Sequence, residues 1–445
     1  MKKITILGAG LSATSLINYL LERAEKYDWA IKLGDYDLDL AKSKVNGNPR
    51  GEAFQFDVTN EALVADIVSK SDIVVSMMPA SFHHIIAKEC VKHKKNMLTA
   101  SYVSDAMKQL NDDAKEAGVG LFNELGVDPG IDHMSAMRII DNLRDNGNKL
   151  NAFFSFTGGL VAPEYDNNPW NYKFTWNPRN VVLAGQGISM FIRNGKYKYI
   201  PYQQLFRRVM TTTVEGYGEF EVYPNRDSLS YRETYGLEDI PTIFRGTMRR
   251  PGYTKAWNVF VQLGATDDTY IIEDSENMTY RDFINTFLPY EKSTPVEVKI
   301  QKLLPELIDE EVMTKLVWLD IFSHKKVELK RATPAQILQK ILEEKWQLDE
   351  GDKDMIVMQH RFEYTDTNDT EKAIISSMVM KGESLQNTAM AITVGLPLAI
   401  ATKMVANGET KLTGVHTPVI PELYNPILDE LAELGIEFTE TEERI

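Results

Sequence analysis

Cysteine is almost absent from this sequence of 445 residues. Cys90 is the only one, so the chain can form no disulfide bond within itself and no cysteine-rich zinc or iron–sulfur site. The HExxH and HxxxH spacings of histidine metal sites are missing as well. We therefore expect no metal.

Positive charge is in short supply. Lys and Arg total 49 against 64 for Asp and Glu, which gives a formal net charge of −15. A nucleic-acid binder needs a basic surface to neutralise phosphates, so we expect no nucleic-acid partner. An anionic substrate would be repelled by the overall field, and would have to be captured by Arg or Lys side chains placed locally.

We also find no long apolar run in the sequence. A membrane span needs about 18 or more apolar residues, and we identify no such run, so we expect no membrane partner. The first residues, MKKITILGAG, predict a β-strand rather than a signal peptide, because their apolar run is short. We expect a soluble, cytoplasmic chain of two or three domains, in keeping with its length and its 43% hydrophobic residues.

Short apolar runs alternate with helical patterns near the N-terminus. The predicted strands are Lys3–Leu7, Ala30–Gly34, Ala53–Phe56, Ile73–Ser76, Met97–Ala100 and Gly120–Asn123. The predicted helices are Ala13–Tyr27, Glu61–Ser69, His83–His93 and Ser104–Ala117. Strands that are apolar on both faces and joined by helices predict an α/β domain with a parallel sheet covered by helices.

A glycine motif lies at the first strand–helix junction. Gly8–Ala13 fits the pattern G-x-G-x-x-A, in which Gly8 permits the tight turn and Gly10 lets the backbone approach a pyrophosphate. The phosphates would lie at the helix N-terminus, near Leu11 and Ser12. Because the motif follows a strand and opens a helix, it predicts a Rossmann-type dinucleotide site.

An acidic residue ends the second strand. Asp35 lies where a carboxylate accepts hydrogen bonds from the adenosine ribose hydroxyls and repels a 2′-phosphate, which favours NAD over NADP. Lys42 and Lys44 are near enough to weaken that preference. The alternative is that Asp35 only begins a turn that caps the next helix. Asp57-Val58, after the third strand, is a candidate adenine contact, although an acid that merely ends a strand explains it equally well.

Three further strand ends carry candidate site residues. Met77-Met78 and Ser101-Tyr102 should line the nicotinamide side of the cleft, although the methionines could equally fill the core. We interpret the pair His83-His84 as a helix cap or a surface feature. The segment Glu124–His133 concentrates turn residues, acids and a histidine, which is typical of a site loop. The alternative is a Pro-Gly turn with Asp132 capping a helix over Met134–Asn142.

Aromatic, β-branched and turn residues dominate from about residue 150 to 275. They predict a second α+β domain on a mostly antiparallel or mixed sheet, with few helices. Tyr223–Ser228 and Arg245–Arg250 are predicted as Arg-rich loops that could capture substrate carboxylates. Surface salt bridges with the surplus acids are the alternative.

The C-terminal third predicts helices and a return of the chain to the first domain. Helical spacing occurs in Val312–Leu319, Ala335–Leu342, Thr388–Ala406 and Leu423–Leu434, and strand alternation in Asp354–Phe362 and Lys372–Val379. We predict a dinucleotide-binding domain over 1–130, completed by about 390–445, and a substrate and dimerisation domain over 131–294 and 350–389. A small helical subdomain is predicted over 295–349.

The motifs of several enzyme classes are missing. The sequence has no Ser/His/Asp nucleophile elbow and no Walker A motif. A nucleotide fold without a hydrolase or phosphotransfer constellation indicates hydride chemistry, which the cofactor itself supplies.

Over nearly its whole length the chain resembles the saccharopine dehydrogenase family of the L-glutamate-forming type. The matching segments are Pro79–His83, Ser101–Ser104, Asn123–His133, Gly158–Leu160 with Ala162–Glu164, Tyr172–Trp176, Tyr223–Ser228, Arg245–Thr247, Ala389–Ala391, Val394–Pro397 and Pro426–Leu428. The pattern N-E-x-G-x-D-P-G-I-D-H is far more specific than the glycine motif.

The resemblance implies an oxidoreductase that interconverts saccharopine with glutamate and 2-aminoadipate 6-semialdehyde in lysine metabolism, with a pyridine nucleotide and usually as a homodimer. From their chemistry, Tyr102 and Asp128 are our candidates for acid/base groups, with His133 as a weaker third. The resemblance implies that Ser101, Tyr102 and Asp128 contact substrate near the nicotinamide. It implies that the substrate carboxylates are held by Arg226, Thr247, Met248 and Arg249. It places the cofactor on Leu7–Leu11, which includes Gly8 and Gly10, and on Asp35. Ser12, Asp57, Val58 and Met78 are further cofactor candidates because of their positions at the strand ends.

Two departures from the family pattern affect these expectations. Many members have cysteine before Gly-Gly-Leu, where this chain has Thr157. Fungal members carry Arg after the second strand and use NADP, whereas this chain has Gly34-Asp35. We therefore expect NAD, with NADP as the alternative.

Two rival functions remain open. A related reductive-amination enzyme, such as a carboxynorspermidine synthase, would share the dinucleotide domain but bind a diamine through acidic contacts, which Arg-rich loops do not favour. A non-catalytic NAD(P)-binding sensor would keep the fold without turnover, and the motifs around Asp128 and Arg226 argue against it.

Overall fold

The computed structural model describes all 445 residues, which divide into two compact units. Unit 1 comprises Met1–Lys149 and Met378–Thr439, and unit 2 comprises Leu150–Ser377 and Glu440–Ile445. Each unit is built around its own sheet. The α/β class with a parallel first sheet and a mixed second sheet is as predicted.

A seven-stranded parallel sheet forms the centre of unit 1. Its strands are β1 (Lys2–Leu7), β2 (Trp29–Asp35), β3 (Gly51–Gln55), β4 (Ile73–Ser76), β5 (Asn96–Thr99), β6 (Gly120–Phe122) and β15 (Gly414–His416). The spatial order β15-β6-β5-β4-β1-β2-β3 reverses between β1 and β4. Ligands of such sheets bind at the carboxyl ends of the strands, near this reversal.

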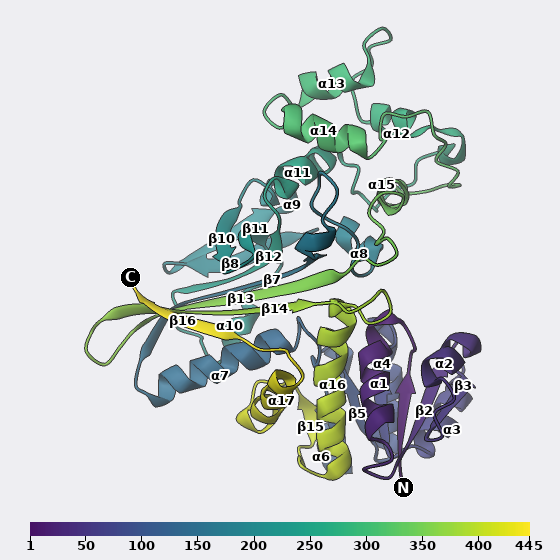
Figure 1. The fold of residues 1–445 in the computed structure, drawn as a ribbon, viewed down its shortest axis with the longest axis vertical. Helices are drawn as coiled ribbons and strands as arrows, with labels where there is room; N and C mark the ends of the chain where they lie inside the picture. The colour runs from purple at the N-terminus through teal and green to yellow at the C-terminus, as the bar shows by residue number, and fades with distance from the viewer. The chain divides into compact units, whose positions relative to one another are not determined.

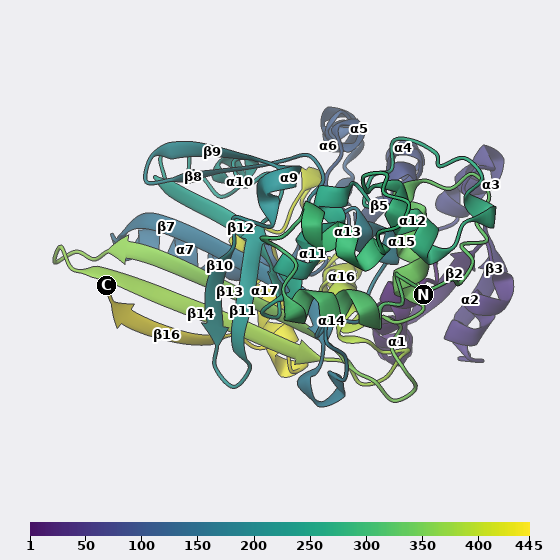
Figure 2. The same ribbon diagram turned by 90° about the horizontal axis from the view of Figure 1, so that it is seen from above.

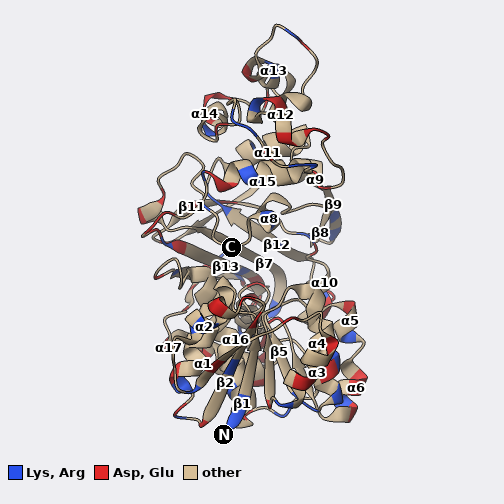
Figure 3. Ribbon diagram, turned by 90° about the vertical axis from the view of Figure 1, so that its right-hand side faces the viewer, with Lys and Arg blue, Asp and Glu red and all other residues tan.

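Helices pack around this sheet, and Figure 3 marks the acidic and basic residues along them. They are η1 (Leu11–Ala13), α1 (Thr14–Arg23), α2 (Leu38–Val45), α3 (Glu61–Ser69), η2 (Ala80–Phe82), α4 (His83–Lys92), α5 (Asp105–Lys108), α6 (Asn111–Ala117), α7 (Ile131–Asp145), α16 (Ala389–Asn407) and α17 (Pro421–Glu433). The helix predicted over Ser104–Ala117 is divided into α5 and α6. The other predicted helices are confirmed to within a few residues at their ends.

Helix α16 corrects the expectation that no apolar run is long enough for a membrane. By length and composition it could span one, with a mean hydropathy of 1.7, but 78% of that window is buried inside the structure. It packs against α1 (Figure 1), and a Cβ on Gly395 would lie 2.7 Å from the Leu16 nitrogen. Only glycine allows this approach, so we interpret α16 as a core helix that supports the helix after the glycine motif.

The unit boundary lies farther along the chain than predicted. Helix α7 was expected in the substrate domain, yet it belongs to unit 1, where it packs against α17. Arg138 of α7 donates to the carbonyl of Asn425 at 2.8 Å and pairs with Asp429 at 2.7 Å. These contacts with the returning chain explain the difference, because they involve residues nearly 300 positions apart.

Unit 2 contains a nine-stranded mixed sheet. Its strands are β7 (Lys149–Val161), β8 (Ile188–Arg193), β9 (Lys196–Pro201), β10 (Met210–Val214), β11 (Gly218–Pro224), β12 (Thr242–Arg249), β13 (Asp354–Thr365), β14 (Glu371–Lys381) and β16 (Thr439–Arg444). The long strands β13 and β14 lie beside each other (Figure 2), and β12 runs parallel to β7 and antiparallel to β11. The segment Arg245–Arg249, predicted as a loop, is therefore part of an interior strand.

The remaining helices of unit 2 gather mainly between residues 253 and 343 (Figure 1). They are η3 (Pro163–Tyr165), α8 (Pro178–Val182), α9 (Tyr202–Leu205), α10 (Ser230–Thr234), α11 (Tyr253–Leu263), η4 (Ser275–Asn277), α12 (Tyr280–Thr286), α13 (Val296–Leu303), α14 (Glu310–Trp318) and α15 (Pro334–Glu343). The sequence did not predict α11. Nine of its eleven residues are buried, and many of them are aromatic or β-branched, which is typical of strands.

Candidate functional site

The predicted cofactor and reaction residues of unit 1 follow the carboxyl ends of successive parallel strands. Gly8, Gly10, Leu11 and Ser12 follow β1; Asp35 ends β2; Asp57 and Val58 follow β3; Met78 follows β4; Ser101 and Tyr102 follow β5; and Asp128 follows β6. Parallel strands bring their carboxyl ends to one edge of the sheet, so the fold gathers these residues at the edge where nucleotides bind.

The glycine loop has the geometry of a pyrophosphate cradle. Gly8 has φ +107°, and a Cβ there would lie 2.8 Å from the carbonyl oxygen of Met77, so no other residue fits. Gly10 is exposed, with open space where a Cβ would be. Leu11, 48% exposed, begins the short helix η1 that leads into α1. These residues fit a dinucleotide, whose phosphates would rest on the backbone N–H groups at Gly10–Ser12.

Asp35 is fixed by backbone donors rather than by a cation. Its Oδ2 accepts a hydrogen bond from the Ala9 N–H at 2.7 Å, and its Oδ1 accepts one from the Asp37 N–H at 2.9 Å. The helix α2 is capped by Asp37, whose side chain accepts from Asp39 and Leu40. The alternative in which Asp35 serves only as the cap is therefore wrong, and its carboxylate is tied directly to the glycine loop.

The other predicted cofactor residues are only partly available. The Asp57 carboxylate accepts from the Thr59 N–H at 2.9 Å and from the Thr59 hydroxyl at 2.7 Å, and these bonds lower the pKa of Asp57. The Val58 side chain is buried in the core, so only its backbone can face a ligand. Met78 packs partly against the same core.

Ser101 is hydrogen-bonded to a buried histidine. His83 Nε2 lies 2.8 Å from the Ser101 hydroxyl, and His83 Nδ1 lies 2.8 Å from the Ser76 hydroxyl. Burial, followed by the charge of His84, lowers the pKa of His83 to about 4, so the ring is neutral near pH 7. The interpretation of His83 as a surface or cap residue is wrong: it is 4% exposed and lies beneath the predicted site.

The two predicted acid/base groups lie together. The Tyr102 hydroxyl donates to Asp128 Oδ1 at 3.2 Å, and Tyr102 is 51% exposed while Asp128 is half-buried. A phenol and a carboxylate in hydrogen-bond reach can pass a proton between a ligand and solvent. Their pairing could not be read from the sequence, where they are 26 positions apart.

Glu124 is a buried residue that the sequence analysis did not single out as functional. Its Oε1 accepts from the Val103 N–H at 2.9 Å, next to Tyr102, and its Oε2 lies 2.7 Å from His133 Nε2. Glu124 thus joins the loop after β5 to the loop after β6. His133 is 1% exposed, which suits a supporting residue better than the acid/base role considered for it.

The loop that carries Asp128 is held tightly by glycine. A Cβ on Gly130 would lie 2.0 Å from the Gly126 carbonyl oxygen, and φ at Gly130 is +147°. Asp132 accepts from the Gly130 N–H at 2.6 Å, within the first turn of α7. The alternative in which Asp132 caps the helix is therefore wrong: Gly130 is the N-cap of α7, and Asp132 lies inside its first turn.

In unit 2, Arg226 follows β11 and is exposed. The structure shows hydrogen bonds of its backbone, to the Asn225 side chain and to the Met190 N–H, but no ion pair of its guanidinium. In a chain with 15 surplus acidic residues, the salt-bridge alternative is wrong for this arginine.

Arg249 is a buried arginine without a counter-ion. It is 3% exposed and lies 5.0, 5.3 and 5.8 Å from the ring centroids of Tyr172, Tyr253 and Tyr223. Its Nη1 donates to the Met248 carbonyl at 2.8 Å, whereas its Nε has no hydrogen-bond partner. The Tyr172 hydroxyl is also unpaired, and burial raises the pKa of Tyr172, which keeps it neutral. A buried cation among neutral phenols is costly unless an anion compensates it.

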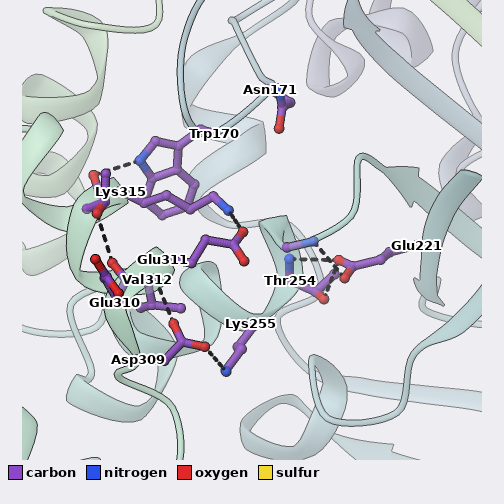
Figure 4. A network of polar contacts seen from close by, with 12 residues as sticks. Trp170, Asn171, Glu221, Thr254, Lys255, Asp309, Glu310, Glu311, Val312 and Lys315 are labelled. Atoms are coloured by element: carbon purple, nitrogen blue, oxygen red, sulfur yellow. Dashed lines mark hydrogen bonds and ion pairs between the residues drawn. The ribbon is translucent and has the colours of Figure 1, made fainter.

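The carboxylate opposite Arg249 in the sheet is engaged elsewhere. Glu221 on β11 is its register partner, yet Glu221 accepts from the Gly252 N–H at 2.8 Å and from the Thr254 N–H and hydroxyl at 3.0 and 2.6 Å (Figure 4). Glu221 thereby caps the start of α11. The same region is fastened to α14, where the Trp170 indole donates to the Lys315 carbonyl at 2.9 Å.

Thr247 and Met248 differ in what they can offer a ligand. Thr247 is half-buried and faces Thr157 of β7 across the sheet, at the position where many family members have cysteine. The Met248 side chain is fully buried, so it belongs to the core, and its predicted contact with substrate would involve its backbone alone. Among the described residues, no group of three or more His, Cys, Asp or Glu could hold a metal ion.

Comparisons with known proteins match both parts of the chain. The saccharopine dehydrogenase NADP binding domain matches residues 4–121, and the saccharopine dehydrogenase C-terminal domain matches residues 126–436. Saccharopine dehydrogenase (NADP(+), L-glutamate-forming) of Schizosaccharomyces pombe is 33% identical over 448 residues, which cover 99% of each chain. The mitochondrial alpha-aminoadipic semialdehyde synthase of Mus musculus is 32% identical over 98% of this chain and 47% of its own length. The solved apo saccharopine dehydrogenase (L-Glu forming) of Saccharomyces cerevisiae has a TM-score of 0.91, 29% identity and full coverage of both chains.

Proposed function

Because the chain belongs to the saccharopine dehydrogenase family, we propose that it interconverts saccharopine with L-glutamate and 2-aminoadipate 6-semialdehyde, as an oxidoreductase of lysine metabolism that uses a pyridine nucleotide. Its full-length similarity to enzymes that carry this activity in their names supports the proposal. The function expected from the resemblance is thus supported independently by both domains.

The geometric observation that carries the proposal is the buried, uncompensated guanidinium of Arg249. Saccharopine has three carboxylates, two from its glutamate part and one from its lysine part. Asn225 pairs with Arg245 on β12, and Arg249 lies four residues farther along that strand, about 13 Å at the usual rise per residue. Arg226 and Arg249 are therefore suited to separate carboxylates of one extended substrate.

In the oxidative direction, saccharopine is converted through an imine and a carbinolamine. A pyridine nucleotide held by the glycine loop and Asp35 would supply the oxidant, and the lysine-derived carbon next to the secondary amine would lose a hydride to it. That carbon and nitrogen become an imine, water adds to the carbon, and the carbinolamine breaks its carbon–nitrogen bond. The products are glutamate and the aldehyde.

The chain's own residues orient the substrate and move protons. Asp128, assisted by the Tyr102 hydroxyl at 3.2 Å, takes the amine proton, places the water and returns a proton to the leaving glutamate nitrogen. The arginines hold the carboxylates, which fixes the reacting carbon in place and lowers the entropic part of the barrier. Ser101 offers a further hydrogen bond to the substrate.

The finer proposal is that NAD(H) is preferred over NADP(H). The family description of the first domain and the names of the fungal relatives contain NADP, so the proposal departs from them. Its support is Asp35, whose fixed carboxylate would face a 2′-phosphate at the ribose position. Lys44 forms no ion pair with that carboxylate, and its Nζ donates to the Thr14 hydroxyl at 2.6 Å.

The test measures formation of reduced nicotinamide and release of glutamate from saccharopine, with NAD and NADP in parallel. We expect turnover, with the larger kcat/KM for NAD. The substitution Asp35→Ala should shift the ratio of the two kcat/KM values toward NADP by about tenfold, the size of one uncompensated charge contact. Faster turnover with NADP by the wild-type chain would refute the preference, and would leave the activity standing.

The same assay distinguishes the rival functions. A carboxynorspermidine synthase would reduce the product of a diamine and an aldehyde but would not oxidise saccharopine. A sensor would bind NADH tightly and turn over neither. Both rivals leave the unpaired Arg226 and Arg249 without a purpose, which is why we do not favour them.

We also propose an assembly, from the family resemblance, and a location, from the sequence. We expect a homodimer in the cytoplasm, acting on small amino-acid substrates without nucleic-acid or membrane partners. These stay predictions, which sedimentation of the purified chain and fractionation of cells would check.

A further inference from the structure

A chain of three side chains runs from the core of unit 1 to the predicted substrate residue Ser101. Ser76 ends β4 and is fully buried, His83 begins α4 and is 4% exposed, and Ser101 follows β5 and is half-buried. Both hydroxyl-to-ring distances are 2.8 Å. No role in the reaction outlined above uses Ser76 or His83.

A neutral imidazole gives these two hydrogen bonds a direction. One ring nitrogen carries a proton and donates, while the other accepts. If Nε2 donates, the Ser101 oxygen accepts from it, and the Ser101 hydrogen is left to donate outward. If Nε2 accepts, Ser101 spends its hydrogen on the ring and presents only lone pairs to the substrate.

The surroundings of the ring favour the tautomer with the proton on Nε2. Two oxygens lie near that nitrogen, Ser101 Oγ at 2.8 Å and Thr99 Oγ1 at 3.4 Å, and a single N–H can point toward both. The Ser76 hydroxyl is then the donor to Nδ1. A substrate rich in carboxylates requires a donor at Ser101, which this arrangement supplies.

We propose that His83, oriented by Ser76, is a positioning residue that holds the Ser101 hydroxyl as a hydrogen-bond donor toward a carboxylate of the bound substrate. This inference rests on the proposed function for the identity of the substrate. The burial that keeps the His83 ring neutral near pH 7 also keeps the direction of its two hydrogen bonds constant in that range.

The kinetic test compares His83→Phe, His83→Gln and Ser101→Ala, alone and combined. His83→Phe should raise KM for saccharopine about tenfold with little change in KM for the nucleotide, because one hydrogen bond to a charged group is weakened. His83→Gln, whose amide can still donate to Ser101, should restore most of that loss. In the Ser101→Ala background, His83→Phe should have no further effect on KM.

The matched control is the neighbouring histidine. His84 is half-buried on the same helix, and the structure shows no side-chain hydrogen bond for it, so His84→Phe should leave KM unchanged. Effects of His83→Phe and Ser101→Ala that multiply would overturn the proposal, because a purely structural role does not depend on the Ser101 hydroxyl. A fall in kcat together with rises in KM for saccharopine and for the nucleotide would overturn it as well.

A second measurement does not depend on activity. In protein labelled with ¹⁵N-histidine, the ring nitrogen shifts of His83, identified by their loss in His83→Gln, should show a protonated Nε2 and an unprotonated Nδ1. Ser76→Ala should mix the two tautomers. A protonated Nδ1 in the wild-type chain refutes the inference even if saccharopine is turned over, whereas a chain that shows the expected tautomer but does not oxidise saccharopine refutes the proposed function instead.

Discussion

The two units prepare for a ligand in opposite ways. In unit 1 the candidate groups are tied to partners: Asp35 to the glycine loop, Glu124 to the loop of Tyr102, and Ser101 to His83. In unit 2, Arg226 and Arg249 have no ion-pair partner, and Glu221, the acid opposite Arg249, is engaged by α11.

This difference teaches how a chain of charge −15 can serve an anionic substrate. Unit 1 is organised by hydrogen bonds before the ligand arrives, which suits positioning and proton transfer. Unit 2 contains arginines without counter-ions, whose positive charge a bound carboxylate would neutralise. The substitutions at Asp128 of unit 1 and at the arginines of unit 2 are expected to separate an effect on kcat from effects on KM for saccharopine.

The largest effect is expected from Asp128→Ala. Loss of a positioned acid/base group should lower kcat about 100-fold or more and change KM for saccharopine little. Steady-state kinetics with saturating nucleotide would measure both values. A rise in KM with kcat unchanged would assign Asp128 to binding, and the contrast between the units would fail.

Arg249→Met is the next largest. It removes the buried guanidinium at similar volume, so KM for saccharopine should rise about 100-fold. The free energy of unfolding of the ligand-free chain should not fall, and could gain up to about 2 kcal/mol, because an uncompensated charge is removed. Denaturant titration without substrate checks this. A clear loss of stability would mean that the aromatic contacts of Arg249 matter more than its missing counter-ion.

Arg226→Ala should raise KM for saccharopine about 10- to 30-fold, less than Arg249→Met because solvent screens an exposed charge. Its kcat should stay within a few-fold of the wild-type value. Arg208→Ala is the control, since Arg208 is another exposed arginine of unit 2 for which the structure shows no ion pair. Equal, small effects for Arg226→Ala and Asp128→Ala would contradict the division of roles.

A pair of glycine substitutions sharpens the comparison. Gly395→Ala places a Cβ 2.7 Å from the Leu16 nitrogen, so it should displace α1 and weaken nucleotide binding several-fold. Gly158→Ala places one 2.8 Å from the Met248 carbonyl, so it should displace β12 and raise KM for saccharopine instead. Each should cost about 1–3 kcal/mol of stability through overpacking. NADH fluorescence titrations and saccharopine kinetics would show whether Gly395→Ala weakens only nucleotide binding and Gly158→Ala raises only KM for saccharopine.

The smallest effect concerns stability in mild acid. The pKa of His83 is lowered to about 4 in the folded chain, below its ordinary value of about 6.5, so between these values the unfolded chain binds more protons. The contribution of His83 to stability is therefore complete above about pH 6.5 and declines as the pH falls toward 4. At about pH 5 the loss should be about 1–2 kcal/mol, and His83→Gln should lack it. A pH profile of unfolding that is identical in both proteins would contradict a buried, neutral His83.

Much of unit 1 could be predicted from the sequence, because its signals are local. Alternating apolar runs and the motif Gly8–Ala13 define strands and a turn within a few residues of each other. In unit 2, α11 was missed because its aromatic and β-branched residues are typical of strands, and β12 was taken for a loop because its arginines and glycine are atypical of an interior strand.

The supporting contacts of the site could not be predicted, since they join distant segments. His83 contacts Ser101, 18 positions away, and Glu124 contacts Val103 and His133 across two loops. Nothing in the local pattern marks a histidine as buried when it opens a helix. Arg249 lacks a counter-ion because Glu221 is engaged by α11. In the sequence, Glu221 is only a separate acidic residue.

The central claim is that this chain oxidises saccharopine, with proton transfer at Asp128 and carboxylate binding at Arg226 and Arg249. The most direct test measures reduced nicotinamide and released glutamate for the wild-type, Asp128→Ala and Arg226→Ala chains over a range of saccharopine concentrations. The account predicts stoichiometric products from the wild-type chain, a lower kcat for Asp128→Ala and a higher KM for Arg226→Ala. A wild-type chain that binds NADH but releases no glutamate from saccharopine would contradict it.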